Sequence, residues 1–138
     1  MADVVNRTIF VADDDPVLLR GLDVALKGHG YTVRTALDGP ELLSLMERER
    51  PDLLLLDVMM PGMDGVEVLR RIRDDGRWSD LPVMMVTAVA DSGVREEAAR
   101  CGPADVVPKP FRLNDLLATI DARLRDSGPA SEHRAASQ

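Results

Sequence analysis

Short apolar runs alternate with amphipathic segments along almost the whole of this chain. Four runs are nearly all apolar, as is typical of strands that helices cover on both faces. They comprise residues 8–12, 53–58, 83–87 and 106–107. Residues 31–35 instead alternate apolar and polar side chains, which indicates a strand at a sheet edge. This alternation predicts an α/β fold with a parallel sheet.

The segments between the strands place apolar residues at helical spacing. Asp15 followed by Pro16 predicts the cap and first turn of a helix, and Asp64 followed by Glu67 predicts a capping box. The side chains expected to face the sheet are Leu18, Leu19, Leu22 and Leu26 in the first helix; Leu42, Leu45 and Met46 in the second; Val68, Leu69 and Ile72 in the third; Val94, Ala98 and Cys101 in the fourth; and Leu113, Leu116, Leu117, Ile120 and Leu124 in the fifth. The side chains expected to face water on the third helix are Arg70, Arg71 and Arg73.

The number and order of these elements favour one architecture. A closed barrel of alternating strands and helices needs roughly 250 residues, so the 138 residues here favour an open sheet. We predict a doubly wound, five-stranded parallel sheet with the flavodoxin-like order 2-1-3-4-5 and five helices on its two faces. Residues 1–126 form the predicted domain. Residues 127–138, rich in Ser, Ala and scattered charges, are expected to be a disordered tail or the stub of a linker.

Charge and cysteine content exclude several classes of function. The net charge of -7 argues against direct binding to nucleic acid, which needs clustered Lys and Arg. The single cysteine, Cys101, excludes an intramolecular disulfide and is typical of a reducing compartment. The apolar runs are too short to span a bilayer. We therefore expect a cytoplasmic protein that does not associate with membranes.

Acidic residues end two of the expected strands. Asp13 and Asp14 follow the first strand, and Asp57 lies near the end of the third. In the expected sheet these ends are neighbours, at the point where the strand order reverses and ligands bind. Carboxylates so close together repel one another unless a cation lies among them, and Mg²⁺ prefers oxygen ligands of this kind. We predict a Mg²⁺ site in which Mn²⁺ can substitute in vitro.

Two further strand ends supply groups that suit a phosphoryl ligand. Thr87 closes the fourth strand with a hydroxyl, and Lys109 follows the fifth strand with an ammonium. A phosphoryl group on Asp57 has about two negative charges at neutral pH, which these groups can meet. We predict that Asp57 is the nucleophile of an in-line phosphoryl transfer. Asp13 and Asp14 are then metal ligands, while Lys109 and Thr87 contact the phosphoryl oxygens.

These motifs, taken in order, resemble a known family. They are Asp13-Asp14 after an apolar strand, Asp57 with Met60-Pro61-Gly62-Met63-Asp64-Gly65, Thr87-Ala88, and Lys109-Pro110-Phe111. Together they resemble a bacterial two-component response-regulator receiver domain of the CheY-like superfamily, over residues 7–126. Each motif is weak evidence alone, but the full set on expected strand ends is specific.

The resemblance implies a signalling switch and its partners. Asp57 would accept a phosphoryl group from a histidine kinase or a histidine phosphotransfer protein, with Mg²⁺ required and the backbone carbonyl of Met59 as a further metal ligand. The surface of the fourth helix, fifth strand and fifth helix would change and signal to a downstream effector, and phosphorylation-dependent homodimerisation is left open. The Lys109-Pro110 bond would be cis. The chain would be no enzyme beyond its own phosphorylation and slow dephosphorylation.

The chain departs from the family pattern at a few positions. Val106 stands where the family usually has an aromatic residue that moves on activation, so the coupling from Thr87 to the surface is expected to differ. Met59 and Val89 are apolar and cannot orient a water, from which we expect slow self-dephosphorylation. Trp78 either packs beyond the third helix or marks a contact patch.

Two alternatives remain. The first is a small phosphohydrolase with Asp13 as nucleophile and Asp15 as acid. The second is a degenerate receiver that only docks to partners, a reading that Val106 leaves open. Replacing Asp57 by Asn separates the first alternative from the switch, because phosphoprotein formation should survive only in the phosphohydrolase.

Overall fold

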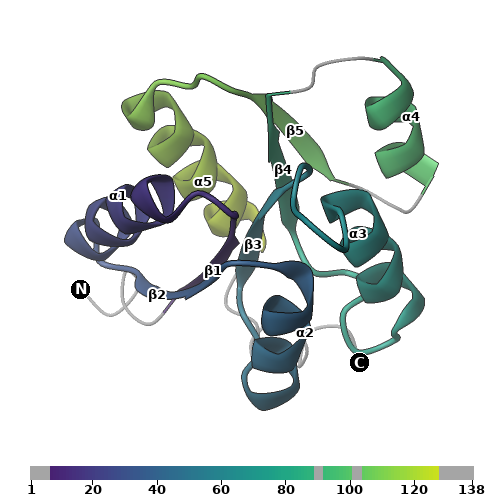
Figure 1. Ribbon diagram of the computed structural model, residues 1–138. Coiled ribbons are helices and arrows are strands. Elements are labelled where there is room, and N and C mark those ends of the chain that lie inside the picture. The colour runs from purple at the N-terminus through teal and green to yellow at the C-terminus, as the bar shows by residue number, and fades with distance from the viewer. Residues whose placement is uncertain (1–6, 89–91, 101–103, 128–138) are drawn as a thin grey trace.

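The strands form one parallel sheet whose order follows the prediction. The computed structural model describes residues 7–88, 92–100 and 104–127. The strands are β1 (Thr8–Ala12), β2 (Thr32–Ala36), β3 (Leu53–Asp57), β4 (Val83–Thr87) and β5 (Asp105–Pro108). They lie in the order β2-β1-β3-β4-β5, and every neighbouring pair is parallel (Figure 1). The α/β class, the parallel sheet and its strand order are therefore confirmed.

Helices cover both faces of the sheet. They are α1 (Pro16–Gly28), α2 (Gly39–Arg48), α3 (Gly65–Asp74), α4 (Ser92–Arg100) and α5 (Leu113–Ser127). Figure 1 shows α1 and α5 on one face of the sheet and α2 and α3 on the other. The side chains of α1 and α5 share one buried cluster with the sheet, and those of α2 and α3 share another. Helix α4 packs beside α3. Among the helices of the described residues, none is long and apolar enough to cross a membrane.

The predicted N-caps at Asp15 and Asp64 are present, and they determine where α1 and α3 begin. The capping box expected at Asp64 is not complete, because the Glu67 carboxylate accepts from Arg70 and Arg71 at 2.6 and 3.1 Å. The Asp15 carboxylate accepts hydrogen bonds from the backbone amides of Val17 and Leu18, at 3.0 and 3.4 Å. The Asp64 carboxylate accepts one from the amide of Glu67 at 2.9 Å. Each cap satisfies amides that have no partner within the helix, so each helix starts directly after the loop at the carboxyl end of a strand.

The predicted core is largely confirmed, with three corrections. Residues 106–107, expected to be covered on both faces, are only partly buried, because β5 is an outer strand of the sheet. The expected inward residues of α3 and most of those of α1 and α5 are buried. Leu113 is an exception, because it is the first residue of α5 and remains 42% exposed. Arg73 does not simply face water: it is partly buried, and its guanidinium donates to the carbonyl oxygens of Trp78 and Ser79 at 3.1 and 3.2 Å.

Some predictions fall outside the described residues. The structure does not describe Val89, Cys101 or residues 128–138 of the predicted tail. For Val94 and Ala98 it describes the backbone but not the side chains. Their expected roles stay predictions.

The register of β1 against β3 places the ends of these strands side by side. Ala12 pairs with Leu56, so Asp13 and Asp57 each follow this pair by one residue. At the other end, the amide of Asp52 donates to the carbonyl of Thr8 at 2.7 Å, and the Asp52 carboxylate accepts from the amide of Thr8 at 2.7 Å. A one-residue slip would break this reciprocal pair and turn the buried side chains to the other face.

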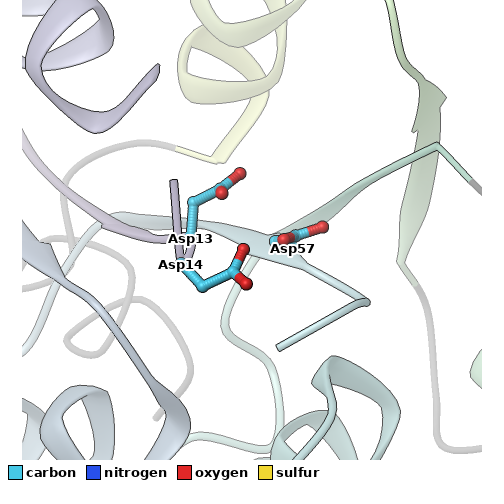
Figure 2. Close-up of side chains that lie close together, drawn as sticks. All are labelled: Asp13, Asp14 and Asp57. Atoms are coloured by element: carbon cyan, nitrogen blue, oxygen red, sulfur yellow. The ribbon is translucent and has the colours of Figure 1, made fainter. Parts of the chain in front are cut away.

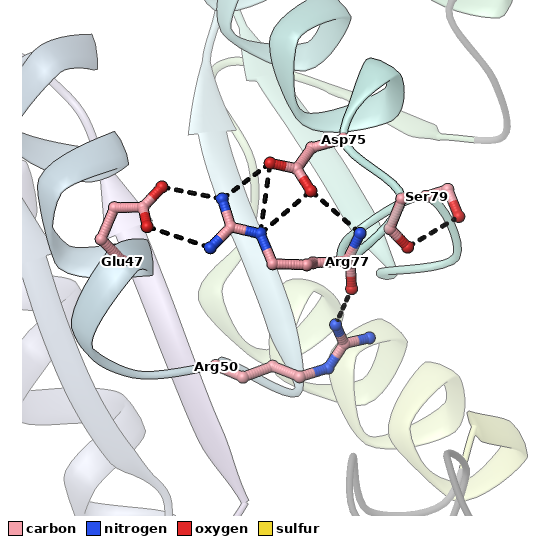
Figure 3. Close-up of polar contacts among 6 residues, drawn as sticks. Glu47, Arg50, Asp75, Arg77 and Ser79 are labelled. Atoms are coloured by element: carbon pink, nitrogen blue, oxygen red, sulfur yellow. Dashed lines mark hydrogen bonds and ion pairs between the residues drawn. The ribbon is translucent and has the colours of Figure 1, made fainter.

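A network of ion pairs connects α2 with the loop that precedes β4. The Arg77 guanidinium contacts both oxygens of Glu47 on α2, at 3.0 and 2.8 Å, and also pairs with Asp75 (Figure 3). The same guanidinium lies 4.3 Å from the centre of the Trp78 ring, which is buried in the core. Trp78 therefore packs beyond α3 and marks no exposed patch. The network lies at the amino ends of the strands, at the opposite edge of the sheet from Asp57.

Candidate functional site

Three carboxylates meet at the carboxyl ends of β1 and β3. Asp13 and Asp14 directly follow β1, and Asp57 is the last residue of β3 (Figure 2). One oxygen of each of these side chains lies within 4.8 Å of one oxygen of each of the others. Asp13 and Asp57 are buried, at 3% and 4% exposure, whereas Asp14 is exposed. The structure thus brings together the acids that the sequence predicted.

Lys109 is the cation at this cluster. Its Nζ donates to Asp13 Oδ2 at 2.8 Å and lies 3.5 Å from Asp57 Oδ1. The backbone amide of Lys109 donates to the carbonyl of Thr87 at 2.8 Å, and the peptide bond to Pro110 is cis, as the resemblance implied. Burial alone would lower the pKa of Lys109, but the hydrogen bond to Asp13 and the charges of Asp13 and Asp57 raise the pKa above its ordinary value.

Asp57 lies in an environment that disfavours its charge. Burial is the largest cause, the negative charge of Asp13 is the next, and together they raise the pKa of Asp57 to about 6. The Lys109 charge and a hydrogen bond from the Met59 amide to Asp57 Oδ1, at 3.3 Å, act in the opposite direction but do not balance the effect. The cluster therefore has more negative charge than its own lysine neutralises.

Thr87 and Met59 complete the surroundings of Asp57. Thr87 ends β4, one residue beyond Val86, which pairs with Asp57, and its side chain is fully buried. Met59 contacts Asp57 through its backbone amide, and its side chain is 57% exposed. Val106, at the position expected to be aromatic, is half-buried against the core cluster of α2 and α3.

The donor set suits a hard divalent cation. Such ions take carboxylate, carbonyl and water oxygens, and Mg²⁺ in particular is usually bound through one or two carboxylates. Here three carboxylates converge, two of them buried, and one lysine leaves the charge of the cluster unbalanced. The residues that are present therefore fit Mg²⁺.

The surroundings of Asp15 bear on the phosphohydrolase alternative. Its carboxylate caps α1, and its own amide donates to Asp13 Oδ1 at 2.9 Å. The Asp15 carboxylate is thus directed at the first turn of α1. Asp13, for its part, is paired with Lys109. Neither residue is arranged as that alternative requires.

The sequence did not indicate two features of the site. Lys109 was expected to contact a phosphoryl ligand, but its pairing with Asp13 was not foreseen. The available signal was a lysine directly after the fifth strand, at the same end of the sheet as the acids. The close contact between Gly65 and the backbone of Asp57 was also missed. A glycine directly after a helix cap was the only sign of that contact.

Comparisons with known proteins agree on one family. The model of the response regulator receiver domain matches residues 9–121. The response regulator MprA of Mycobacterium leprae (strain TN) is 44% identical over 121 residues, which cover 88% of this chain and 52% of that protein. MprA of Mycobacterium avium (strain 104) is 42% identical over 124 residues, 90% of this chain and 54% of that one. The chain spans about half the length of these curated relatives.

Solved structures show the same fold. The chemotaxis protein CheY4 of Vibrio cholerae has a TM-score of 0.81 and 28% identity, covering 86% of this chain and 98% of its own. The response regulator TrrA of Thermotoga maritima, solved in complex with Mg(2+)-BeF, has a TM-score of 0.73 and 30% identity, covering 84% of this chain and 97% of its own.

Proposed function

The chain belongs to the family of response-regulator receiver domains, and from this premise we propose that it is a phosphorylation switch of a two-component or phosphorelay system in which Asp57 accepts the phosphoryl group. The observation on which the proposal depends is the cluster itself. A buried carboxylate ends β3, two further carboxylates lie within 4.8 Å, and a lysine amine lies 3.5 Å away. We assign residues 1–126 to the receiver domain and residues 127–138 to a tail or linker stub.

The proposed transfer is an in-line displacement at phosphorus. An Asp57 oxygen attacks, the phosphorus–nitrogen bond to the donor histidine breaks, and its electron pair remains on the imidazole. Positioning and charge neutralisation supply most of the catalysis in such reactions. Lys109 is close enough to turn from Asp13 toward the new phosphoryl oxygens, whose charge of about two it partly neutralises. The Thr87 hydroxyl is the proposed second donor to the phosphoryl oxygens.

The proposed ligands of Mg²⁺ are the carboxylates of Asp13, Asp14 and Asp57 and the backbone carbonyl of Met59. The ion, when bound, supplies the positive charge that lets the carboxylates ionise together and that neutralises the transferred phosphoryl oxygens. Mn²⁺ is expected to substitute in vitro, since it also accepts oxygen ligands. TrrA, which has the same fold, was solved in complex with Mg(2+)-BeF, and this supports Mg²⁺ as the ion.

Partners follow from the family. A histidine kinase or a histidine phosphotransfer protein is the proposed phosphoryl donor, and a downstream effector reads the altered surface of α4, β5 and α5. The net charge of -7 favours protein partners over nucleic acid for this chain. Homodimerisation on phosphorylation is left to experiment. Receiver domains are signalling proteins, and the only chemistry proposed here is the chain's own phosphorylation and its slow reversal.

The test is exposure of the ¹⁵N-labelled chain to beryllofluoride with Mg²⁺, a mimic of the phosphorylated state. Amide shifts around residues 57–59 should move first, followed by shifts in α4, β5 and α5. The Asp57→Asn variant should show neither set of changes. Shifts confined to the acidic cluster would favour a receiver that binds phosphate without switching, and no shifts in the wild-type chain would contradict the proposal.

A further inference from the structure

Helix α3 begins in direct contact with the backbone of the proposed acceptor. Gly65, the first residue of α3, is buried. A Cβ atom added to it would lie 2.3 Å from the carbonyl oxygen of Asp57, 2.8 Å from Cα of Val58 and 3.0 Å from the carbonyl carbon of Asp57. All three neighbours are backbone atoms, so no side chain can rotate away to make room. Only glycine fits between α3 and the end of β3.

The same residues share hydrogen bonds that determine the shape of this segment. The amide of Gly65 donates to the carbonyl of Val58 at 2.8 Å. The amide of Met59 belongs to the same peptide group as this Val58 carbonyl, and it donates to Asp57 Oδ1 at 3.3 Å. The first turn of α3 therefore holds the peptide groups on either side of Val58, and one of them orients the Asp57 carboxylate.

We infer that Gly65 is a positioning residue for the phosphoacceptor, because its missing side chain lets α3 seat residues 57–59 so that the Asp57 carboxylate and the Met59 carbonyl face one metal ion. The inference rests on the proposed function and adds a residue with no polar group of its own to the site. Gly65 acts entirely through the backbone of its neighbours and touches neither metal nor phosphoryl group.

The size of the effect follows from the distance. Ordinary van der Waals contact begins near 3.4 Å, so a methyl group on Gly65 must push the Asp57 carbonyl away by roughly 1 Å. Misplacement of reacting groups by about 1 Å can reduce a rate by about 100-fold. We expect Gly65→Ala to slow phosphorylation of Asp57 by about 10- to 100-fold. We expect it to weaken Mg²⁺ binding by about 10-fold.

The chain offers matched glycines for the experiment. Gly21 is exposed in α1, and a Cβ added there meets nothing within 4 Å, so Gly21→Ala should stabilise the fold without touching the site. It serves as the background for every variant. Gly39→Ala is the control for a close contact, since its added Cβ would lie 2.8 Å from Val68 Cγ2 and 3.2 Å from Met63 Sδ, which are side-chain atoms that can yield.

Three readouts separate positioning from general destabilisation. The first is the pattern of ¹⁵N amide shifts of Val58 and Met59 in the metal-free chain, the second is the Mg²⁺ dissociation constant from an NMR titration, and the third is the rate of phosphorylation by acetyl phosphate. Gly65→Ala should change all three, whereas Gly39→Ala should lower the melting temperature and leave all three unchanged.

The outcomes distinguish this inference from the function on which it rests. If Gly65→Ala keeps the amide shifts and the Mg²⁺ affinity of the background chain, or fails to fold even in that background, Gly65 has a structural role only and the inference is wrong. If the background chain itself is never phosphorylated, the proposed function fails, and the metal-free shifts and Mg²⁺ titration still decide the role of Gly65. Equal losses in Gly39→Ala would also overturn the inference.

Discussion

Replacing Asp57 by Asn should stabilise the metal-free protein, even though it removes the group on which function depends. Asp57 is 4% exposed, and its pKa is raised to about 6, first by burial and then by the charge of Asp13. At neutral pH the folded chain must therefore hold a carboxylate charge that its surroundings disfavour. Asparagine has nearly the same shape and no charge, so it removes this cost.

The magnitude and its pH dependence follow from linkage. The pKa of Asp57 is about 6 in the folded chain against an ordinary 3.8, and each unit corresponds to about 1.4 kcal/mol, which gives at most about 3 kcal/mol. The folded state binds the extra proton, so the wild-type protein loses this stability as the pH rises from about 4 to about 6. The Asn variant does not. The difference between the two proteins should be near zero at pH 4 and largest above pH 6.

Urea denaturation in EDTA at several pH values measures this difference, with Asp14→Asn as the control. Asp14 belongs to the same cluster but is exposed, so its replacement should have a much smaller effect. Added Mg²⁺ should then stabilise the wild-type chain more than the Asp57→Asn variant, because ligands that bind only the folded state shift the equilibrium by mass action. An Asn variant that is less stable at pH 7, or a difference that does not change with pH, would refute the reasoning.

Three further substitutions test separate parts of the account. Lys109→Met removes the ammonium beside Asp13 and Asp57. The pKa of Asp57 should therefore rise above about 6, which a ¹³C NMR titration measures. An unchanged pKa would contradict the assigned contact. Tyr31→Phe removes the hydroxyl that donates to Asp121 on α5, which should cost about 1–2 kcal/mol in urea denaturation while the phosphorylation rate stays the same. Met59→Asn places a polar group beside Asp57 and should shorten the lifetime of the acyl phosphate; an unchanged lifetime would show that water orientation at this position does not limit dephosphorylation.

Much of the fold could be predicted because its signals are local. The apolar runs identify the central strands, and the caps at Asp15 and Asp64 locate the starts of α1 and α3. The boundaries were less accurate where tertiary contacts decide them. Strand β2 begins at Thr32, one residue later than its polar alternation suggested. Leu113 is exposed although it continues the apolar spacing of α5.

The acids of the site could be predicted, but the contacts among its other groups could not. Asp13, Asp14 and Asp57 were found because parallel strands bring their carboxyl ends to one edge of the sheet. The pairing of Lys109 with Asp13 depends on the conformation of the loop after β5, which leaves no periodic pattern in the sequence. The contact of Gly65 with the Asp57 backbone depends on how closely α3 approaches β3, and a single glycine does not reveal that distance.

The most direct test of the account is the intact mass of the protein after incubation with acetyl phosphate. With Mg²⁺ present, the wild-type chain should gain the mass of one phosphoryl group, and the gain should be absent in EDTA and in the Asp57→Asn variant. A chain that never gains this mass with Mg²⁺ and donor present, or an Asn variant that gains it equally well, would contradict the assignment of Asp57 as the phosphoacceptor of a three-carboxylate metal site.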